Sequence, residues 1–207
     1  MTFKEVLIVI GKKQLALTLC LLGSTVSAHA GGTATVVCSK TANPVPLLQV
    51  AYNTGPDAGT PGLFWFGVIS QDMTLGSVLT PQGWQNYTGG LYPFQARYDN
   101  GLPPTITLTL PFPDGNRNTG AYVGYSVYAG QGVYSYAMRQ KVADRRTALN
   151  NVKPDMVAKG RWRPEFDSDD TYIWSLIQKD MKDNNKYGPI LTIPFVDCTP
   201  AETGGGG

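Results

Sequence analysis

Histidine is nearly missing from this chain: its 207 residues contain one, His29. That residue lies in an N-terminal leader, so removal of the leader would leave no imidazole. Serine and cysteine triads would then lack their usual base, and imidazole metal sites could not form. Any catalysis would rest on carboxylates, tyrosines or lysines. The sequence therefore favours a protein that is not an enzyme.

Long hydrophobic runs are also missing. The apolar run 15–22 follows Lys12 and Lys13 and is too short to span a bilayer, which takes about 20 residues. A small-residue motif, Ala-His-Ala, ends at Ala30, so we predict a secretory signal peptide over 1–30, cleaved after Ala30. The alternatives are an uncleaved anchor and a lipoprotein at Cys20. We expect an exported protein, periplasmic, cell-surface or extracellular, with no transmembrane segment after cleavage.

Charge is scarce as well, since only 15% of the residues are charged and the net charge is +2. Lys4, Lys12, Lys13 and Glu5 lie in the leader and account for the whole excess. A net charge near zero argues against a nucleic-acid binder and against a general binder of anionic membranes. A protein partner or self-assembly is the expected interaction, and a glycan is a further possibility.

Cysteine is limited to three residues, one of which lies in the leader. Cys38 and Cys198 remain, one near each end of the mature chain. In an oxidising compartment we predict a disulfide between them that clasps the termini. Two free thiols or an intermolecular bond are the alternatives. Two cysteines without histidine make a poor metal site.

Glycine, proline and tyrosine are abundant and separate short runs with strand character. The predicted fold is α+β: a mostly antiparallel sheet or sandwich with two helices in the C-terminal half. We expect one β-rich domain over 31–198, a helical segment at about 136–187 and a disordered Gly-rich tail over 199–207. The predicted strands are 33–38, 47–52, 63–69, 105–110, 122–129, 133–136 and 190–196, and the predicted helices are 136–150 and 169–182. The glycines at 130 and 132 are expected to break the chain between two of these strands.

The helix predicted at 169–182 has the clearest signals. Ser168 or Asp167 can cap its N-terminus, and its apolar arc comprises Ile173, Trp174, Leu176, Ile177 and Met181. Asp180 falls inside this arc. We expect it to pair with an arginine at the boundary between helix and sheet, and a functional role is the alternative.

An acidic cluster, 165–170, precedes this helix. Capping is the simplest interpretation, but Asp167 and Asp169 with backbone carbonyls could ligate calcium, the only cofactor that the sequence suggests. Glu165 is the first residue to test for a carboxylate-dependent hydrolase, which would need a second carboxylate across a cleft.

Aromatic residues provide the other candidate site. Trp84, Tyr87 and Tyr92 lie in a glycine-rich stretch, where their rings could form a platform for sugars. Packing of these rings onto the sheet is the alternative. A third motif, Arg161-Trp162-Arg163, could bind an anion, although ion pairs with the nearby acids are a simpler expectation.

Our main hypothesis is an exported, non-catalytic structural or binding domain of bacterial type, located at the cell surface, associated with a pilus, or periplasmic. An edge strand at 191–195 could take part in assembly by strand addition. The alternatives are a carbohydrate-binding module that uses the loop aromatics and, less favoured, the hydrolase.

Overall fold

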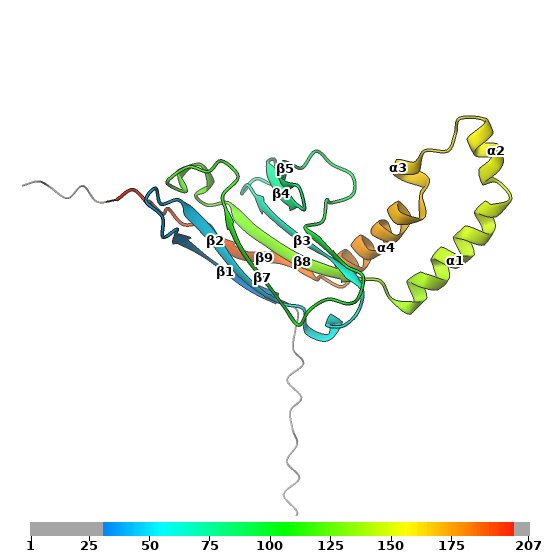
Figure 1. The fold of residues 1–207 in the computed structure, drawn as a ribbon, viewed down its shortest axis with the longest axis horizontal. Coiled ribbons are helices and arrows are strands. Elements are labelled where there is room, and N and C mark those ends of the chain that lie inside the picture. The colour runs from blue at the N-terminus through cyan, green and yellow to red at the C-terminus, as the bar shows by residue number, and fades with distance from the viewer. Residues whose placement is uncertain (1–30, 201–207) are drawn as a thin grey trace, which may run out of the picture.

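A computed structural model describes residues 31–200 (Figure 1). The predicted leader with its cleavage point after Ala30, and residues 201–207 of the predicted tail, lie outside the described residues. The strands are β1 (Gly31–Cys38), β2 (Pro46–Asn53), β3 (Gly62–Ile69), β4 (Gly76–Thr80), β5 (Gly83–Asn86), β6 (Ala96–Tyr98), β7 (Thr105–Pro111), β8 (Ser126–Val133) and β9 (Tyr187–Thr192). The helices are α1 (Tyr136–Asn150), α2 (Lys153–Ala158), α3 (Pro164–Asp167) and α4 (Asp169–Asp183).

The strands form two antiparallel sheets. The smaller sheet has the order β1-β2-β7, and the larger has the order β5-β4-β3-β8-β9, with β6 paired to β3. All four α-helices fall in the C-terminal half, and α1 and α4 are the substantial ones. The predicted class, α+β with an antiparallel sandwich and two main helices, is confirmed.

The main core lies between the two sheets. Period-2 alternation points Leu48, Val50 and Tyr52 of β2 inward, and they meet the larger sheet through contacts such as the edge-on packing of Tyr52 on Phe64, with ring centroids 5.2 Å apart. In β2 the buried positions follow the side-chain alternation of a pleated strand. A sequence pattern of period 2 thus places one face of each sheet in a shared apolar layer.

Strand β3 is buried on both faces, which explains its unbroken apolar sequence. Phe64 and Phe66 belong to the core between the sheets, whereas Leu63 and Trp65 belong to a second core beneath α4. Helix α4 contributes Ile177 and Met181 to that second core. The larger sheet is therefore covered on its outer face by a helix.

Helix α4 begins as predicted, because the Ser168 side chain accepts a hydrogen bond from the backbone N–H of Thr171 at 3.2 Å. Its predicted apolar arc faces the sheet, with Leu176, Ile177 and Met181 buried. Gln178 is also buried, which the sequence did not predict because glutamine is polar. The cap and the apolar arc together fix where α4 starts and which side packs down.

The predicted chain break at glycines 130 and 132 is wrong: β8 runs through both glycines. A Cβ on Gly130 would collide with the backbone of Lys186 and Tyr187, and one on Gly132 would collide with the backbone of Ile177. These glycines let β9 and α4 approach β8 closely. Their role is to allow close packing within a strand, and they do not form a turn.

The disulfide between Cys38 and Cys198 is confirmed, with the two Cα atoms 5.5 Å apart and a sequence separation of 160. It joins the end of β1 to the segment that follows β9. The clasp therefore links an edge of the smaller sheet to the chain that leaves the larger one.

The last strand is shifted from its predicted position at 190–196. Strand β9 pairs with β8 from Tyr187 to Thr192 and stops there. Pro194 follows, and a proline has no N–H to continue the ladder. The segment proposed for strand addition, 191–195, is thus only partly a strand, although β9 does form one edge of the larger sheet.

Helices α1, α2 and α3 form a helical arm, defined as residues 136–167, that extends away from the sandwich (Figure 1). Val142 is the one buried residue of α1, and α2 and α3 have none. No helix within residues 31–200 is both long and apolar enough to cross a membrane.

Candidate binding site around Tyr92

The segment between β5 and β6 crosses the outer face of the larger sheet and is held there by side chains from β3 and α4. The indole N–H groups of Trp65 and Trp174 both donate to the Tyr92 carbonyl, at 2.8 and 3.0 Å. The Tyr92 N–H donates to the Gln178 side-chain oxygen at 2.6 Å. The N–H and the carbonyl of Tyr92 are thus both hydrogen-bonded to side chains of β3 and α4, which holds this segment in place on the surface.

Three further tyrosines, from separate parts of the chain, gather beside Tyr92. The Tyr87 ring packs edge-on against Tyr92 with centroids 4.9 Å apart, and Tyr187 lies between Tyr92 and Tyr128 at 6.3 and 5.3 Å. Burial, with the neighbouring tyrosines adding to it, raises the pKa of Tyr187 far above its ordinary value. Tyr187 therefore stays neutral across the physiological range, and the cluster presents aromatic rings and hydroxyl groups beside Tyr92.

An apolar cavity of about 190 Å³ opens on one side of the Tyr92 segment; we call it the aromatic pocket. Met73 and Leu75, in the turn between β3 and β4, stand at this cavity with 72% and 62% of their surface exposed. Aliphatic side chains this exposed leave apolar surface in water. The lining residues are Trp65, Phe66, Ile69, Met73, Thr74, Leu75, Gly76, Val78, Tyr87, Tyr92, Pro93 and Tyr187.

A second cavity of about 320 Å³ opens on the other side of the segment; we call it the arginine cleft. Its walls include Phe94 and Trp174, which pack edge-on with centroids 5.3 Å apart. Arg97 lies at this cleft and donates to Asp99 at 2.6 Å, with Asp170 at 3.7 Å. The hydrogen bond from Arg97 to Asp99 raises the pKa of Arg97, so the cleft combines aromatic faces with permanent charges.

The structure brings together two of the three predicted platform aromatics. Tyr87 and Tyr92 line the aromatic pocket, but Trp84 belongs to the core between the sheets. Its indole packs against Phe66, with centroids 6.0 Å apart, and donates to the Pro111 carbonyl at 3.0 Å. Trp84 therefore joins β5 to the end of β7 and does not extend the platform.

Sequence reasoning missed the residues that complete these two cavities, namely Trp65, Phe94, Tyr134, Trp174 and Tyr187. They come from β3, the segment before β6, the end of β8, α4 and β9. No local spacing connects them. The tyrosine-rich stretch 122–136 was the one available signal, because Tyr128 of β8 and Tyr134, which follows β8, both lie on the side covered by α4.

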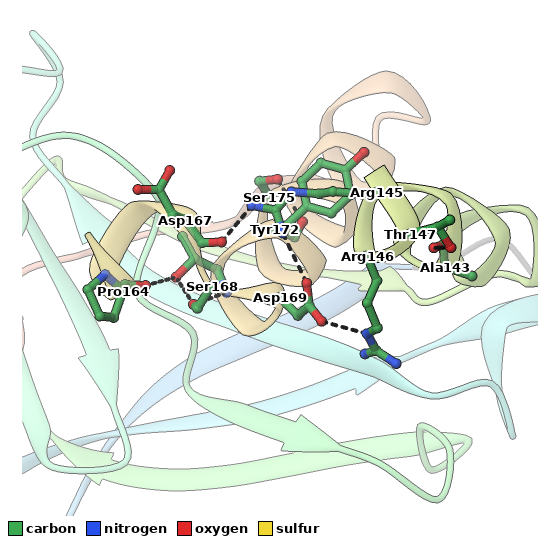
Figure 2. A network of polar contacts seen from close by, with 11 residues as sticks. Ala143, Arg145, Arg146, Thr147, Pro164, Asp167, Ser168, Asp169, Tyr172 and Ser175 are labelled. Atoms are coloured by element: carbon green, nitrogen blue, oxygen red, sulfur yellow. Dashed lines mark hydrogen bonds and ion pairs between the residues drawn. The ribbon is translucent and has the colours of Figure 1, made fainter. Parts of the chain in front are cut away.

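The acidic cluster at the start of α4 makes contacts with arginines. Asp169 contacts Arg145 at 3.0 Å and Arg146 at 2.9 Å (Figure 2). The Asp167 carboxylate accepts from the backbone N–H of Arg163 at 2.8 Å. Within residues 31–200, no three or more His, Cys, Asp or Glu residues gather where they could hold a metal. Calcium at Asp167 and Asp169 stays a prediction, and these arginines would compete with it.

Glu165 is exposed in α3 and lines neither the aromatic pocket nor the arginine cleft. A glycosidase-type mechanism needs a second carboxylate held across a cleft from the first. The position of Glu165 therefore gives the hydrolase hypothesis no support.

Asp180 pairs with a lysine and not with the expected arginine. The Lys186 ammonium lies 2.9 Å from Asp180 and 2.8 Å from Asp57, and all three side chains are at most 17% exposed. Burial lowers the pKa of Lys186, but the hydrogen bonds and charges of the two aspartates outweigh it and raise the pKa. Asp180 also accepts from the Val133 backbone N–H at 2.9 Å. Its role is to tie α4 to β8 and to the loop after β2.

Comparisons with protein-family models, with curated proteins and with solved structures found no match to this chain. The site therefore rests on its own geometry: two cavities that flank a rigidly held aromatic segment.

Proposed function

We propose that this protein is an exported, non-catalytic binding domain that takes an apolar side chain of a protein partner in the aromatic pocket. The observation that carries the proposal is the pairing of a preformed apolar cavity with the exposed Met73 and Leu75 beside it. Apolar side chains that stay in water beside a cavity are typical of a surface that a partner covers.

The rigidity of the pocket supports this proposal. Trp65, Trp174 and Gln178 fix the Tyr92 backbone. Binding of a partner would therefore cost little conformational entropy in this segment. Binding energy at protein interfaces concentrates in such pockets, where an aromatic or aliphatic anchor is fully desolvated. A pocket of this size fits one side chain of the partner, with Met73 and Leu75 closing over it.

The proposed location and the absence of catalysis rest on the chain itself. The leader has the features of a cleaved signal, and no histidine follows Ala30. The disulfide is compatible with an oxidising compartment. Association with a pilus or with the cell surface is part of the same proposal, since both place the domain beside protein partners.

Selection of peptides from a displayed random library tests the proposal. We expect enriched peptides that share an aromatic or aliphatic anchor and that perturb the NMR signals of Tyr87 and Tyr92. Leu75→Ser and Tyr87→Ala should each weaken the peptide by about 2 kcal/mol. Trp84→Phe, on the other face of the sheet, is the matched control and should leave the affinity unchanged. Peptides that bind equally well to all three variants would count against the pocket.

A carbohydrate site in the arginine cleft is the second candidate function. Sugar rings stack on aromatic faces, and charged side chains form hydrogen bonds with the sugar hydroxyl groups. The arginine cleft has both kinds of group, because Phe94 and Trp174 line it together with Arg97 and Asp170. This arrangement moves the glycan hypothesis away from Trp84. A glycan array should give a signal that Trp174→Leu or Arg97→Met abolishes and that Tyr87→Ala leaves intact. An array without signal would end this hypothesis.

A further inference from the structure

The zero net charge expected for the chain after Ala30 hides a strong separation of charge. Over residues 136–167 the sequence has eight lysines and arginines against four aspartates and glutamates. All of these residues belong to the helical arm, whose helices project from the sandwich (Figure 1). The whole-chain charge, which argued against an anionic partner, is therefore a poor guide to this part of the surface.

Many of the positive charges on the arm have no acidic partner. Within residues 31–200, Arg139, Lys141, Lys153, Arg161 and Arg163 form no ion pair. The ion pairs expected between the Arg-Trp-Arg motif and the nearby acids are not made. The acids at 167 and 169 are used instead by Arg145, by Arg146 and by the backbone of Arg163.

The distal part of the arm, residues 152–166, adds exposed apolar side chains to this charge; we call it the arm tip. Val152, Val157 and Phe166 are 47%, 54% and 61% exposed. Figure 1 shows α2 at the outer end of the arm and α3 on the way back toward α4. A flat surface could therefore contact the tip without meeting the sandwich.

Two of the tip cations lie over aromatic rings. The Lys153 ammonium is 4.5 Å from the centre of the Trp162 ring, and the Arg163 guanidinium is 4.8 Å from the centre of the Phe166 ring. Each pair presents a positive charge and an apolar ring at one place. A lipid headgroup layer accepts both, because its phosphates attract the cation while the boundary with the acyl chains buries the ring.

We propose that the arm tip is a peripheral anchor for an anionic lipid surface. Charge complementarity accounts for the cations, and burial at the headgroup boundary accounts for Val152, Val157 and Phe166. A nucleic acid would engage the same cations through its phosphates but would leave these aliphatic side chains in water. The tip therefore fits a membrane better than a polynucleotide.

Sedimentation with vesicles tests this anchor in the purified, disulfide-bonded protein. We expect binding to vesicles of phosphatidylglycerol and phosphatidylcholine, little binding to pure phosphatidylcholine, and loss of binding at high salt. The triple variant Lys153→Ser, Arg161→Ser, Arg163→Ser should bind about a hundredfold more weakly, because each basic residue near the surface contributes about fivefold. Phe166→Ser should weaken binding without changing its salt dependence.

The matched control removes three positive charges from the rest of the molecule: Lys40→Ser, Arg117→Ser, Lys179→Ser. It should bind vesicles as the unmodified protein does. Equal losses in the two triple variants, binding to neutral vesicles, no vesicle binding at all, or binding to a DNA duplex in place of vesicles would each overturn the proposal. Should the tip triple variant fail to fold, Arg161→Ser alone serves as the test, since the Arg161 side chain makes no ion pair or hydrogen bond within the described residues.

Discussion

The sandwich and the helical arm are built in opposite ways. The sandwich has a double apolar core, a disulfide between its ends and a buried Asp–Lys–Asp cluster. The arm has one buried residue in α1, none in α2 or α3, and several exposed apolar side chains. We propose that the difference separates two tasks: the sandwich supplies stability and holds the Tyr92 segment in place, while the arm leaves surface exposed for contact.

Removing the disulfide should have the largest effect, and it should act on the sandwich. The double variant Cys38→Ser, Cys198→Ser should lower the free energy of unfolding by about 4 kcal/mol, because the clasp closes a very long loop in the unfolded chain. Urea unfolding of oxidised and reduced protein measures this loss. Reduction should not affect the double variant further. An unchanged midpoint in the variant would show that the clasp adds nothing to the sandwich.

Removing one paired cation from each region sharpens the comparison. Lys186→Met leaves two nearly buried carboxylates facing each other and should cost about 3 kcal/mol. Arg146→Met removes an arginine that is 65% exposed and should cost about 0.5 kcal/mol, since solvent screens such pairs. Chemical denaturation of both variants tests the contrast, and equal losses would contradict the division between the regions.

Alkaline pH should weaken the sandwich through its buried tyrosines and Lys186. Burial raises the pKa of Tyr52, with the charge of Asp57 adding to it, and burial raises the pKa of Tyr187. The pKa of Lys186 is raised by its aspartate partners. In all three cases the folded state holds its proton more tightly, so the stability is fully present below the unfolded pKa values, near about 10, and is lost above them.

The melting temperature should therefore fall when the pH rises above about 10. Tyr187→Phe removes one titrating group and should make this fall shallower. Tyr136→Phe, which alters a tyrosine that is 76% exposed in the arm, is the matched control and should leave the pH dependence unchanged. If the melting temperature of the Tyr187→Phe variant fell as steeply with pH as that of the unmodified protein, Tyr187 would not contribute to the pH dependence.

Truncation of Val142 should have the smallest effect on global stability. Val142→Ala removes the one buried side chain of α1 and should loosen the arm by about 1 kcal/mol, with little change in the urea midpoint of the sandwich. Val68→Ala in β3 should instead lower that midpoint directly. Circular dichroism and urea titration of the two variants separate these effects. A large midpoint shift for Val142→Ala would contradict the prediction, because it would show that the arm and the sandwich unfold as one cooperative unit.

The parts of the fold that local patterns specify could be predicted from the sequence. Alternation predicted β7, short runs with strand character predicted β2 and β3, and the Ser168 cap with its apolar arc predicted α4. The short strands β4, β5 and β6 were missed, because they depend on pairing with other strands: β4 and β6 pair with β3, and β5 pairs with β4. Gly130 and Gly132 were misread for the same reason: the backbone that approaches them comes from distant segments.

The candidate site was predictable only where it is local. Tyr87 and Tyr92 are close both in sequence and in space. Trp84 is even closer to Tyr87 in sequence, but strand alternation in β5 points its side chain toward the core between the sheets. Trp174 and Tyr187 join the site through the packing of α4 and β9. A sequence carries no short-range signal for such a meeting.

Hydrogen exchange followed by mass spectrometry, with and without anionic vesicles, measures both tasks in one experiment. In solution, amides of β3 and β8 should exchange only on global unfolding, and those of α1 and α2 should exchange much earlier through local opening. On vesicles, the arm alone should gain protection. Exchange of arm and sandwich as one unit, or protection on vesicles that falls on the sandwich and spares the arm, would contradict the division of tasks proposed for this protein.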